Sequence, residues 1–258
     1  MKQEEKFLKV ARLAVKKGEP IFLKCFGKPE EVSVKAGASP TLVTEADGEI
    51  EKIISAEISR EFPSHAIVGE EGSPKKGDSP YTWYLDPIDG TTNFSRGFSP
   101  CVISAGLFDG EGPLVAVISD PVCRNEYYAI RGGGAFKNGK PIGVSKVSSF
   151  NMLVGGFGWK GQNGPKDGAE LLKKILKVTR TARVLGSHAM QLAMVAEGVL
   201  DCFAANGTSI WDVAAGLLLV SEAGGKVTDW SGAPFVQSGQ SIVGSNGIIH
   251  EALLKVLG

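Results

Sequence analysis

The chain has 258 residues, with 28 basic and 28 acidic side chains and a hydrophobic fraction of 43%, as expected for a globular protein with a large core. The net charge of zero excludes a global field that would draw the protein onto nucleic acid or an anionic membrane, so any anion must be bound locally. No stretch approaches the roughly 18 apolar residues of a membrane span, and the polar amino terminus lacks the apolar block of a secretory signal, so we expect a cytoplasmic protein.

The first 65 residues favour two helices. Apolar residues at helical spacing predict a first helix that ends near Gly18 and Pro20. A capping-box pattern at residues 44–47, followed by isoleucines on one helical face, predicts a second helix that stops near Pro63. Between them lies a glycine-containing, extended stretch.

Short apolar runs separated by turn residues predict strands in the middle third of the chain. Asp109-Gly110 and Asn138-Gly139 are strong turn signals between such runs, which predicts an antiparallel sheet with short connections. The predicted strands are residues 66–68, 81–85, 101–108, 114–119 and 126–130.

The final third alternates between the two kinds of element. A soft boundary near residues 143–150 suggests that the single domain, 1–258, consists of two intimate halves, roughly 1–145 and 146–258, that share a cleft. Residues 152–154, 182–185 and 241–244 are predicted to be extended, whereas 169–178, 189–197, 211–223 and the last few residues are predicted to be helical.

The most informative segment is Trp83–Phe94, with the sequence WYLDPIDGTTNF, in which an apolar strand runs into two acids three residues apart. The proline between the acids lacks an N–H group, and the glycine after them permits a sharp bend. Asp86, Asp89 and the carbonyl group of Ile88 can therefore converge on one point. Oxygen ligands of this kind suit a hard cation such as Mg²⁺.

Further acids occur at comparable places. Glu70 and Glu71 follow a predicted strand, and Asp212 begins a predicted apolar helix. Simpler explanations exist for each: a solvated turn for the glutamates, a helix cap for Asp212, and a turn cap for Asp86 and Asp89. Several acids at strand ends and helix starts are, however, what a phosphate site with two or three metal ions requires.

Together these segments resemble the signature of the inositol monophosphatase family, which belongs to a wider lithium-sensitive, magnesium-dependent phosphatase superfamily. The resemblance spans most of the chain. It rests on LVTEAD at residues 42–47, GEE at 69–71, DPIDGTTNF at 86–94, GS at 186–187 and WDVAAG at 211–216.

The resemblance implies a set of metal ligands. Glu70, Asp86 and the Ile88 carbonyl would hold a first Mg²⁺ ion, while Asp86, Asp89 and Asp212 would hold a second. A third, weaker ion would lie near Glu70, which gives two to three ions per site. Manganese is expected to substitute for magnesium.

It also implies the catalytic and substrate-binding residues. Asp47 and Thr91 resemble the pair that orients and deprotonates the attacking water, with Glu70 in the same catalytic group. Lys35 resembles a basic residue on a mobile loop, or it is an ordinary surface lysine. The implied substrate contacts are Asp89, Gly90, Thr91, Thr92, Gly186, Ser187, His188 and Asp212, with the backbone at 90–92 cradling the phosphate.

The expected fold is a mixed α/β, layered αβαβα sandwich of the sugar-phosphatase type, with an antiparallel sheet in the N-terminal part and a smaller mixed sheet in the C-terminal part. The expected activity is Mg²⁺-dependent hydrolysis of a phosphate monoester of a small polyol or sugar, first of all inositol 1-phosphate. On the same analogy we expect lithium sensitivity and a homodimer.

One departure from the family pattern concerns the substrate. Enzymes of this family that are tuned to inositol phosphate place a glutamate seven residues before the aspartate that follows tryptophan, and here Ala205 stands at that position, with Asn206 beside it. A relaxed pocket would admit fructose 1,6-bisphosphate, so a dual-specificity fructose-1,6-bisphosphatase/inositol monophosphatase is the main alternative.

Two alternatives belong to other functional classes. Residues 156–161 fit the dinucleotide-binding pattern GxGxxG, but the following Gln162–Pro165 would break the helix that this motif should open, so we reject an oxidoreductase. A non-catalytic regulatory protein is the other alternative. The intact set of acids argues against it.

The remaining cysteines and histidines are expected to be structural. Cys25, Cys101, Cys123 and Cys202 have no zinc-type spacing and should be reduced, buried and inert. His65 and His250 are expected at the surface. His188 follows the GS segment and therefore either lines the substrate pocket or is structural.

Overall fold

The computed structural model of the chain describes residues 2–28, 32–35, 41–72, 74–159, 165–235 and 241–258. Within these residues no helix has both the length and the apolar character needed to cross a bilayer. The helices are α1 (Gln3–Cys25), α2 (Glu45–Glu61), α3 (Thr91–Ser95), α4 (Pro165–Ile175), α5 (His188–Ala196), α6 (Ile210–Glu222) and α7 (His250–Leu257), with a 3₁₀ turn at Phe150–Met152.

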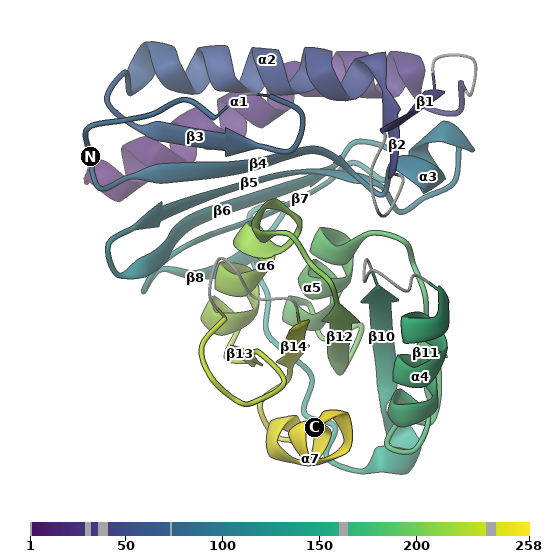
Figure 1. The fold of residues 1–258 in the computed structure, drawn as a ribbon. Helices are drawn as coiled ribbons and strands as arrows, with labels where there is room; N and C mark the ends of the chain where they lie inside the picture. Colours follow the sequence, from purple (N-terminus) through teal and green to yellow (C-terminus); the bar gives the residue numbers. More distant parts are fainter. Residues whose placement is uncertain (1, 29–31, 36–40, 73, 160–164, 236–240) are drawn as a thin grey trace.

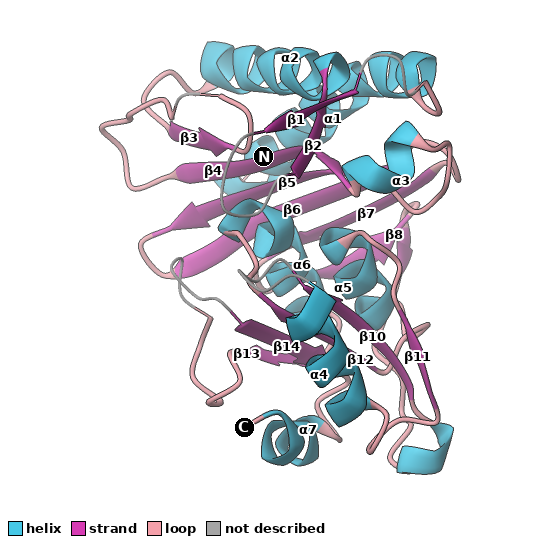
Figure 2. Cartoon of the chain, turned by 45° about the vertical axis from the view of Figure 1, so that its right-hand side comes forward, coloured by secondary structure: helices cyan, strands magenta, loops and turns pink. Residues whose placement is uncertain are grey.

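The elements form five layers in the order helices, sheet, helices, sheet, helices (Figures 1 and 2). α1 and α2 cover the outer face of the larger sheet, α5 and α6 lie between the two sheets, and α4 and α7 cover the far face of the smaller sheet. This is the layered α/β sandwich that the sequence and the family resemblance predict.

The larger sheet has seven strands in the order β3-β4-β5-β6-β7-β8-β9. From β4 to β9 neighbouring strands are antiparallel, as the turn signals predict, whereas β3 runs parallel to β4. The last two strands were not predicted. The strands are β3 (Ala66–Gly69), β4 (Thr82–Asp89), β5 (Val102–Asp109), β6 (Gly112–Asp120), β7 (Asn125–Ile130), β8 (Gly134–Lys137) and β9 (Lys140–Pro141).

The smaller sheet has five strands in the order β11-β10-β12-β14-β13. β10 is parallel to β11 and β12, while β14 is antiparallel to β12 and β13, so the sheet is mixed as predicted. β12 and β13 were not predicted from the sequence. The strands are β10 (Val154–Trp159), β11 (Thr181–Arg183), β12 (Cys202–Asn206), β13 (Lys226–Thr228) and β14 (Ser241–Ser245), and a separate antiparallel pair joins β1 (Val32–Lys35) to β2 (Thr41–Thr44).

The predicted end of the first helix at Gly18 and Pro20 is wrong, because α1 continues to Cys25. Gly18 is buried against α2: a Cβ atom on it would lie 2.9 Å from Cγ2 of Ile50, so glycine here permits close contact between the helices. Pro20 is exposed, but Phe22 in the next turn is fully buried. Burial of that turn offsets the cost of an internal proline, about 3 kcal/mol.

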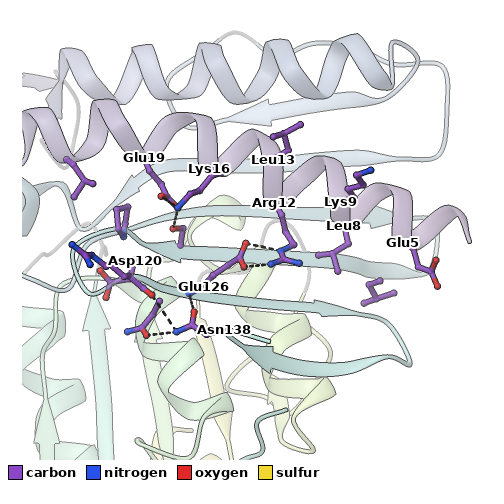
Figure 3. Close-up of a pocket in the computed structure, with 16 residues that line it drawn as sticks. Glu5, Leu8, Lys9, Arg12, Leu13, Lys16, Glu19, Asp120, Glu126 and Asn138 are labelled. Atoms are coloured by element: carbon purple, nitrogen blue, oxygen red, sulfur yellow. Dashed lines mark hydrogen bonds and ion pairs between the residues drawn. The ribbon is translucent and has the colours of Figure 1, made fainter. Parts of the chain in front are cut away.

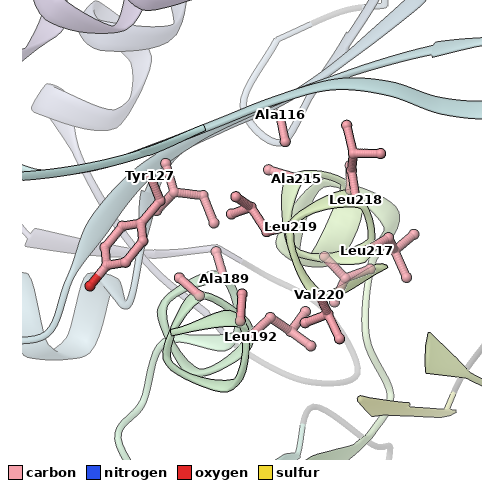
Figure 4. Close-up of a cluster of buried hydrophobic side chains, with 14 of the residues drawn as sticks. Ala116, Tyr127, Ala189, Leu192, Ala215, Leu217, Leu218, Leu219 and Val220 are labelled. Carbon is pink, nitrogen blue, oxygen red and sulfur yellow. The ribbon is translucent and has the colours of Figure 1, made fainter. Parts of the chain in front are cut away.

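α6 is buried at every residue from Asp212 to Val220, because it lies between the two sheets. Figure 4 shows Ala215 and Leu219 of this helix near Ala116 of the larger sheet, with Leu192 of α5 in the same cluster. The helix is therefore a rigid support between the sheets, and its first turn carries Asp212 into the interior of the protein.

Two histidines that were predicted at the surface are buried. The ring nitrogen Nδ1 of His65 accepts a hydrogen bond of 3.1 Å from the indole of Trp83, and His250 contacts the hydroxyl groups of Thr228 and Ser245 at 2.8 Å each. Burial lowers the pKa of both imidazoles to about 4, so both are neutral at pH 7. His65 lies in the bend between α2 and β3, and His250 is the first residue of α7, so neither lies inside a periodic pattern that would reveal its burial.

The cysteines differ in burial. Cys101 and Cys202 are buried as predicted, and burial raises the pKa of the Cys202 thiol to about 12, which keeps it protonated. Cys25 is half-buried. The prediction is wrong for Cys123, which is exposed beside the loop after α3.

Candidate active site

The site begins where β4 ends. Asp86 and Asp89 both lie within this strand, buried to 1% and 5% exposure. Pairing with β5 shifts register between the two aspartates, because the intervening proline has no N–H group to donate. The backbone N–H of Ile88 instead donates to Oδ1 of Asp86 at 3.1 Å. The bulge holds both carboxylates at one end of the sheet.

Three carboxylates meet at this end of the sheet. Glu70, Asp86 and Asp212 each offer an oxygen atom, and these atoms lie within 4.8 Å of one another. Since β3 is parallel to β4, their carboxyl ends are neighbours, and the N–H of Glu70 donates to the carbonyl of Leu85 at 3.2 Å. Asp212 enters from α6, where its Oδ2 accepts the N–H of Ser209 at 2.9 Å in a capping box.

This cluster fits a divalent cation. Two of its three carboxylates, those of Asp86 and Asp212, are almost completely buried, and like charges so close together repel one another strongly. A hard cation relieves that repulsion, and Mg²⁺ accepts carboxylate oxygens as its ligands. The structure thus brings together three of the predicted metal ligands from three separate elements.

Asp89 makes a different set of contacts. Its carboxylate accepts hydrogen bonds from the hydroxyl of Ser187 at 2.6 Å, the N–H of His188 at 3.2 Å and the N–H of Ala189 at 2.6 Å. These donors form the start of α5, where the helix dipole favours a negative charge. Asp89 therefore fixes α5 against the end of β4, and it lies outside the three-carboxylate group.

The predicted phosphate cradle follows directly. Gly90 has a φ of 95° and caps the short helix α3, whose first residue, Thr91, donates its hydroxyl hydrogen to the Ile88 carbonyl at 3.1 Å. A side chain at Gly90 would also crowd the carbonyl of Gly186, 3.1 Å from an ideal Cβ position. Thr92 is exposed. The backbone N–H groups at residues 90–92 thus lie at the start of α3, where successive N–H groups can bind an anion.

A side chain that was not singled out from the sequence closes this loop. The amide of Asn93 donates to the carbonyl of Pro100 at 2.8 Å and to that of Leu185 at 2.6 Å. Gly186, with a φ of 76°, packs against the same amide. Asn93 thus ties α3 to the segment that carries Ser187. Asn93 lies within the 86–94 segment on which the family resemblance rests, and this position is the sequence signal that could have identified it.

His188 lies between the carboxylate cluster and the smaller sheet. Its Nδ1 atom is 3.8 Å from Oδ2 of Asp212, and the side chain is 8% exposed. Its Nε2 atom lies 2.4 Å from where a Cβ on Gly158 would be. Gly158 is the register partner of Ala205, so the imidazole lies against the strand position next to Ala205, where the family resemblance leads us to expect glutamate in inositol-specific enzymes.

The remaining predicted residues lie on α2 and β1. Asp47 is in the first turn of α2 and is 1% exposed. Lys35 ends β1, and its side chain lies outside the described residues. A further buried acid of α2, Glu51, was missed, although its spacing of four residues from Asp47 places both on one face of the helix.

The dinucleotide-binding pattern also has a structural explanation. Gly156 and Gly158 lie inside β10 and open no helix, while Gly161 lies outside the described residues. A Cβ on Gly156 would lie 2.8 Å from the Gln191 amide oxygen. The two glycines therefore let α5 pack closely on β10.

A groove of about 820 Å³ lies elsewhere, between α1 and the β6–β7 end of the larger sheet (Figure 3). Its central cation, Arg12, forms two hydrogen bonds with Glu126 at 2.9 and 2.6 Å and lies over the ring of Tyr128. Lys16 pairs with Glu19 at 2.6 Å. Arg12 and Lys16 are thus paired with acids, and none of the predicted site residues that the structure describes lines this groove.

Comparison with known proteins adds independent findings. The sequence model of the Inositol monophosphatase family matches residues 3–258. "Phosphatase IMPL1, chloroplastic" of Arabidopsis thaliana is 36% identical over 257 residues, covering 96% of this chain and 69% of that protein. "Fructose-1,6-bisphosphatase/inositol-1-monophosphatase" of Thermotoga maritima is 37% identical over 232 residues, covering 90% and 88%. The solved structure of extragenic suppressor protein suhB from Bartonella henselae superposes with a TM-score of 0.92 at 31% identity, covering 98% of both chains.

Proposed function

Since this chain belongs to the inositol monophosphatase family and is a phosphoric monoester hydrolase, we propose that its main reaction converts inositol 1-phosphate to myo-inositol and phosphate. We propose Mg²⁺ as the cofactor, with two to three ions per site and Mn²⁺ as a substitute. The observation that carries the proposal is the cluster of Glu70, Asp86 and Asp212 beside the predicted phosphate cradle.

The residues divide into those that hold the cations and those that handle the substrate. Glu70, Asp86 and the Ile88 carbonyl would hold one ion, and Asp86, Asp89 and Asp212 a second. Bound cations supply the positive charge that stabilises the phosphoryl oxygens and the departing alkoxide. Phosphate monoesters are among the slowest substrates to hydrolyse without a catalyst, so this electrostatic contribution has to be large.

The chain's own groups bind the phosphate and position the water. The N–H groups at residues 90–92 would donate to the phosphate oxygens, since they lie at the start of α3, which Gly90 begins in the left-handed conformation that glycine adopts readily. The Thr91 hydroxyl donates its hydrogen to the Ile88 carbonyl, so its oxygen would accept a hydrogen bond from the attacking water and orient it. Asp47, a buried carboxylate, would take up the proton that this water loses as it attacks the phosphorus.

Phosphate release from inositol 1-phosphate, measured with and without added Mg²⁺, tests this proposal. Turnover with magnesium and none in excess EDTA is the expected result. Equal rates in both conditions would overturn the metal mechanism. No turnover of any phosphate ester would instead favour the non-catalytic regulatory protein, which the intact acid cluster argues against.

A second function is favoured by a specific observation. Ala205 replaces the glutamate expected to grip the inositol ring, and it is completely buried. Without that carboxylate the pocket selects by shape, which supports a dual fructose-1,6-bisphosphatase and inositol monophosphatase activity, as the name of the Thermotoga relative also states for that protein. We further propose a cytoplasmic homodimer that is inhibited by lithium.

A further inference from the structure

We propose that Glu51 is a positioning residue that holds the backbone of Glu71, next to the metal ligand Glu70, and thereby sets how tightly the site binds its cation. This inference rests on the proposed metal site, because it assigns Glu70 as a ligand. Glu51 lies on α2, is 6% exposed, and occurs in none of the segments that indicate the chemistry.

The carboxylate of Glu51 contacts the turn that carries Glu70. Its Oε2 atom accepts a hydrogen bond of 2.9 Å from the backbone N–H of Glu71. A carboxylate is costly to bury without donors, so its place against this turn is a specific contact. Because Asp47 and Glu51 are four residues apart, one face of α2 presents both acids.

Two glycines make room for this carboxylate. An ideal Cβ on Gly69 would lie 2.3 Å from Oε2 of Glu51, and one on Gly72 would lie 2.4 Å from its Oε1. Neither glycine has the positive φ that would explain its presence by backbone conformation. The turn with the sequence GEEG at residues 69–72 therefore partly encloses the carboxylate of Glu51.

The other side of the turn is fixed by the larger sheet. The N–H of Glu70 donates to the carbonyl of Leu85, the residue before Asp86. The backbone at 70–71 thus has one hydrogen bond to β4 and one to α2, made by consecutive N–H groups. With both bonds present, the Glu70 side chain leaves the turn in a fixed direction, toward Asp86 and Asp212. Groups that orient ligands in this way typically change metal affinity by about 10- to 100-fold.

The same helix offers a matched control. Glu57 is also a buried acid of α2, 5% exposed, but its carboxylate pairs with Lys17 and Arg60 and contacts no part of the 69–72 turn in the described structure. Replacing Glu57 should change stability without changing cation binding. Gly48, whose Cβ position is open, is the corresponding control for glycine substitutions.

Cation binding is measured directly with Mn²⁺, by titration calorimetry and by the paramagnetic resonance signal of the free ion, on the folded full-length chain. Glu51→Ala should weaken Mn²⁺ binding about tenfold or more, whereas Glu51→Gln, whose amide oxygen still accepts the Glu71 N–H, should stay within about fivefold of the parent. Gly69→Ala should reproduce the loss because its Cβ displaces the carboxylate. Glu57→Gln and Gly48→Ala should bind like the parent.

The double variant Glu51→Ala/Gly69→Ala tests whether both changes act through one contact. It should bind Mn²⁺ no more weakly than Glu51→Ala alone, since the group that Gly69 accommodates is then absent. Phosphatase kinetics supply a second readout: the Mg²⁺ concentration for half-maximal activity should rise, while KM for substrate at saturating metal stays unchanged. A merely structural role would lower the melting temperature and leave both the Mn²⁺ affinity and the Mg²⁺ concentration for half-maximal activity unchanged.

The outcomes separate this inference from the proposed function. If the parent does not bind Mn²⁺, or if Asp86→Asn binds it equally well, the proposed metal site is wrong. If the parent binds Mn²⁺ and Asp86→Asn does not, but Glu51→Ala binds like the parent, Glu51 has no positioning role. Glu51→Gln binding as weakly as Glu51→Ala would also overturn the inference, because the hydrogen-bond acceptor would then be irrelevant.

Discussion

The hydroxyl group of Ser187 donates a hydrogen bond of 2.6 Å to Oδ2 of Asp89, a residue 98 positions earlier in the sequence. The bond joins the start of α5 to the end of β4, the strand that also carries Asp86 of the carboxylate cluster. Hydrogen bonds to charged groups contribute about 1.5–3 kcal/mol, and both partners here are buried.

Replacing Ser187 by alanine should therefore lower the free energy of unfolding by about 2 kcal/mol and reduce turnover, because Asp89 loses one of its three donors from α5. Urea denaturation and phosphate release measure the two effects. Ser221→Ala is the control, since that hydroxyl only donates to a carbonyl within α6. If both variants lose the same stability, the bond to Asp89 has no special importance.

Asp86→Asn should leave the protein folded but remove nearly all turnover. The substitution keeps the shape of the side chain and deletes the charge at the centre of the three-carboxylate group. In the absence of metal the variant should even unfold at a higher temperature than the parent, because repulsion among the acids decreases. Native circular dichroism with activity within tenfold of the parent would show that Asp86 is no bridging ligand.

Cation preference forms a separate prediction. Activity should require Mg²⁺, tolerate Mn²⁺ and be inhibited by Ca²⁺, whose longer and more variable coordination suits in-line transfer poorly. Lithium should also inhibit. Rates measured after dialysis against EDTA and readdition of each ion provide the test. Full activity in excess chelator contradicts the metal mechanism, whereas resistance to lithium alone indicates only a changed second site.

The sequence predicts the parts of the site that lie within one segment. Asp86, Asp89 and the glycine after them are neighbours in the chain, so their convergence follows from local geometry. That Asp212 joins Glu70 and Asp86 came from the family resemblance, because no local pattern shows that the start of α6 faces the ends of β3 and β4.

What the sequence could not provide depends on tertiary contacts. Pro20 was expected to end α1, yet burial of Phe22 in the next turn outweighs the local signal. His250 looked like a surface residue because the hydroxyl groups that surround it come from β13 and β14. Glu51 was overlooked for a similar reason: the N–H group that it accepts lies 20 residues away, in a turn whose glycines gave no positional clue.

The surroundings of His250 predict a pH dependence of stability. The Thr228 hydroxyl donates its hydrogen to the Asp229 carbonyl, so it must accept from Nε2, and Nδ1 then accepts from Ser245. Burial is the main reason why a second ring proton is disfavoured, the charge of Lys226 nearby adds to this, and Glu251 opposes it.

The folded-state pKa of His250 is about 4, below the ordinary value of 6.5, so the unfolded chain binds the proton more readily. The stabilisation is therefore complete above about pH 6.5 and is lost as the pH falls toward 4. Melting temperatures measured from pH 7.5 to 4.5 should decrease less steeply for His250→Gln than for the parent. His65, whose pKa is lowered similarly, should keep part of the slope in that variant. Parallel curves would contradict the assignment.

The substrate preference follows from Ala205 and from the imidazole of His188, which lies against Gly158, the register partner of Ala205. Because sites that pair a buried group with a substrate hydroxyl discriminate by roughly 10⁴ or more, and this one lacks that group, we expect inositol 1-phosphate and at least one other ester to react within about two orders of magnitude in kcat/KM. Glycerol 2-phosphate and fructose 1,6-bisphosphate are the esters to compare.

Ala205→Glu should sharpen the preference for inositol phosphate by up to about 3 kcal/mol, the scale of a charged hydrogen bond. The structure adds a condition: His188 rests on Gly158, the register partner of Ala205, so a glutamate there competes with the imidazole for space. The gain should therefore be larger when Ala205→Glu is introduced into a His188→Ala background, with His188→Ala alone as the reference. A parent enzyme that already discriminates 10⁴-fold would contradict this view, since Asn206, His188 or a partner subunit would then supply the missing contact.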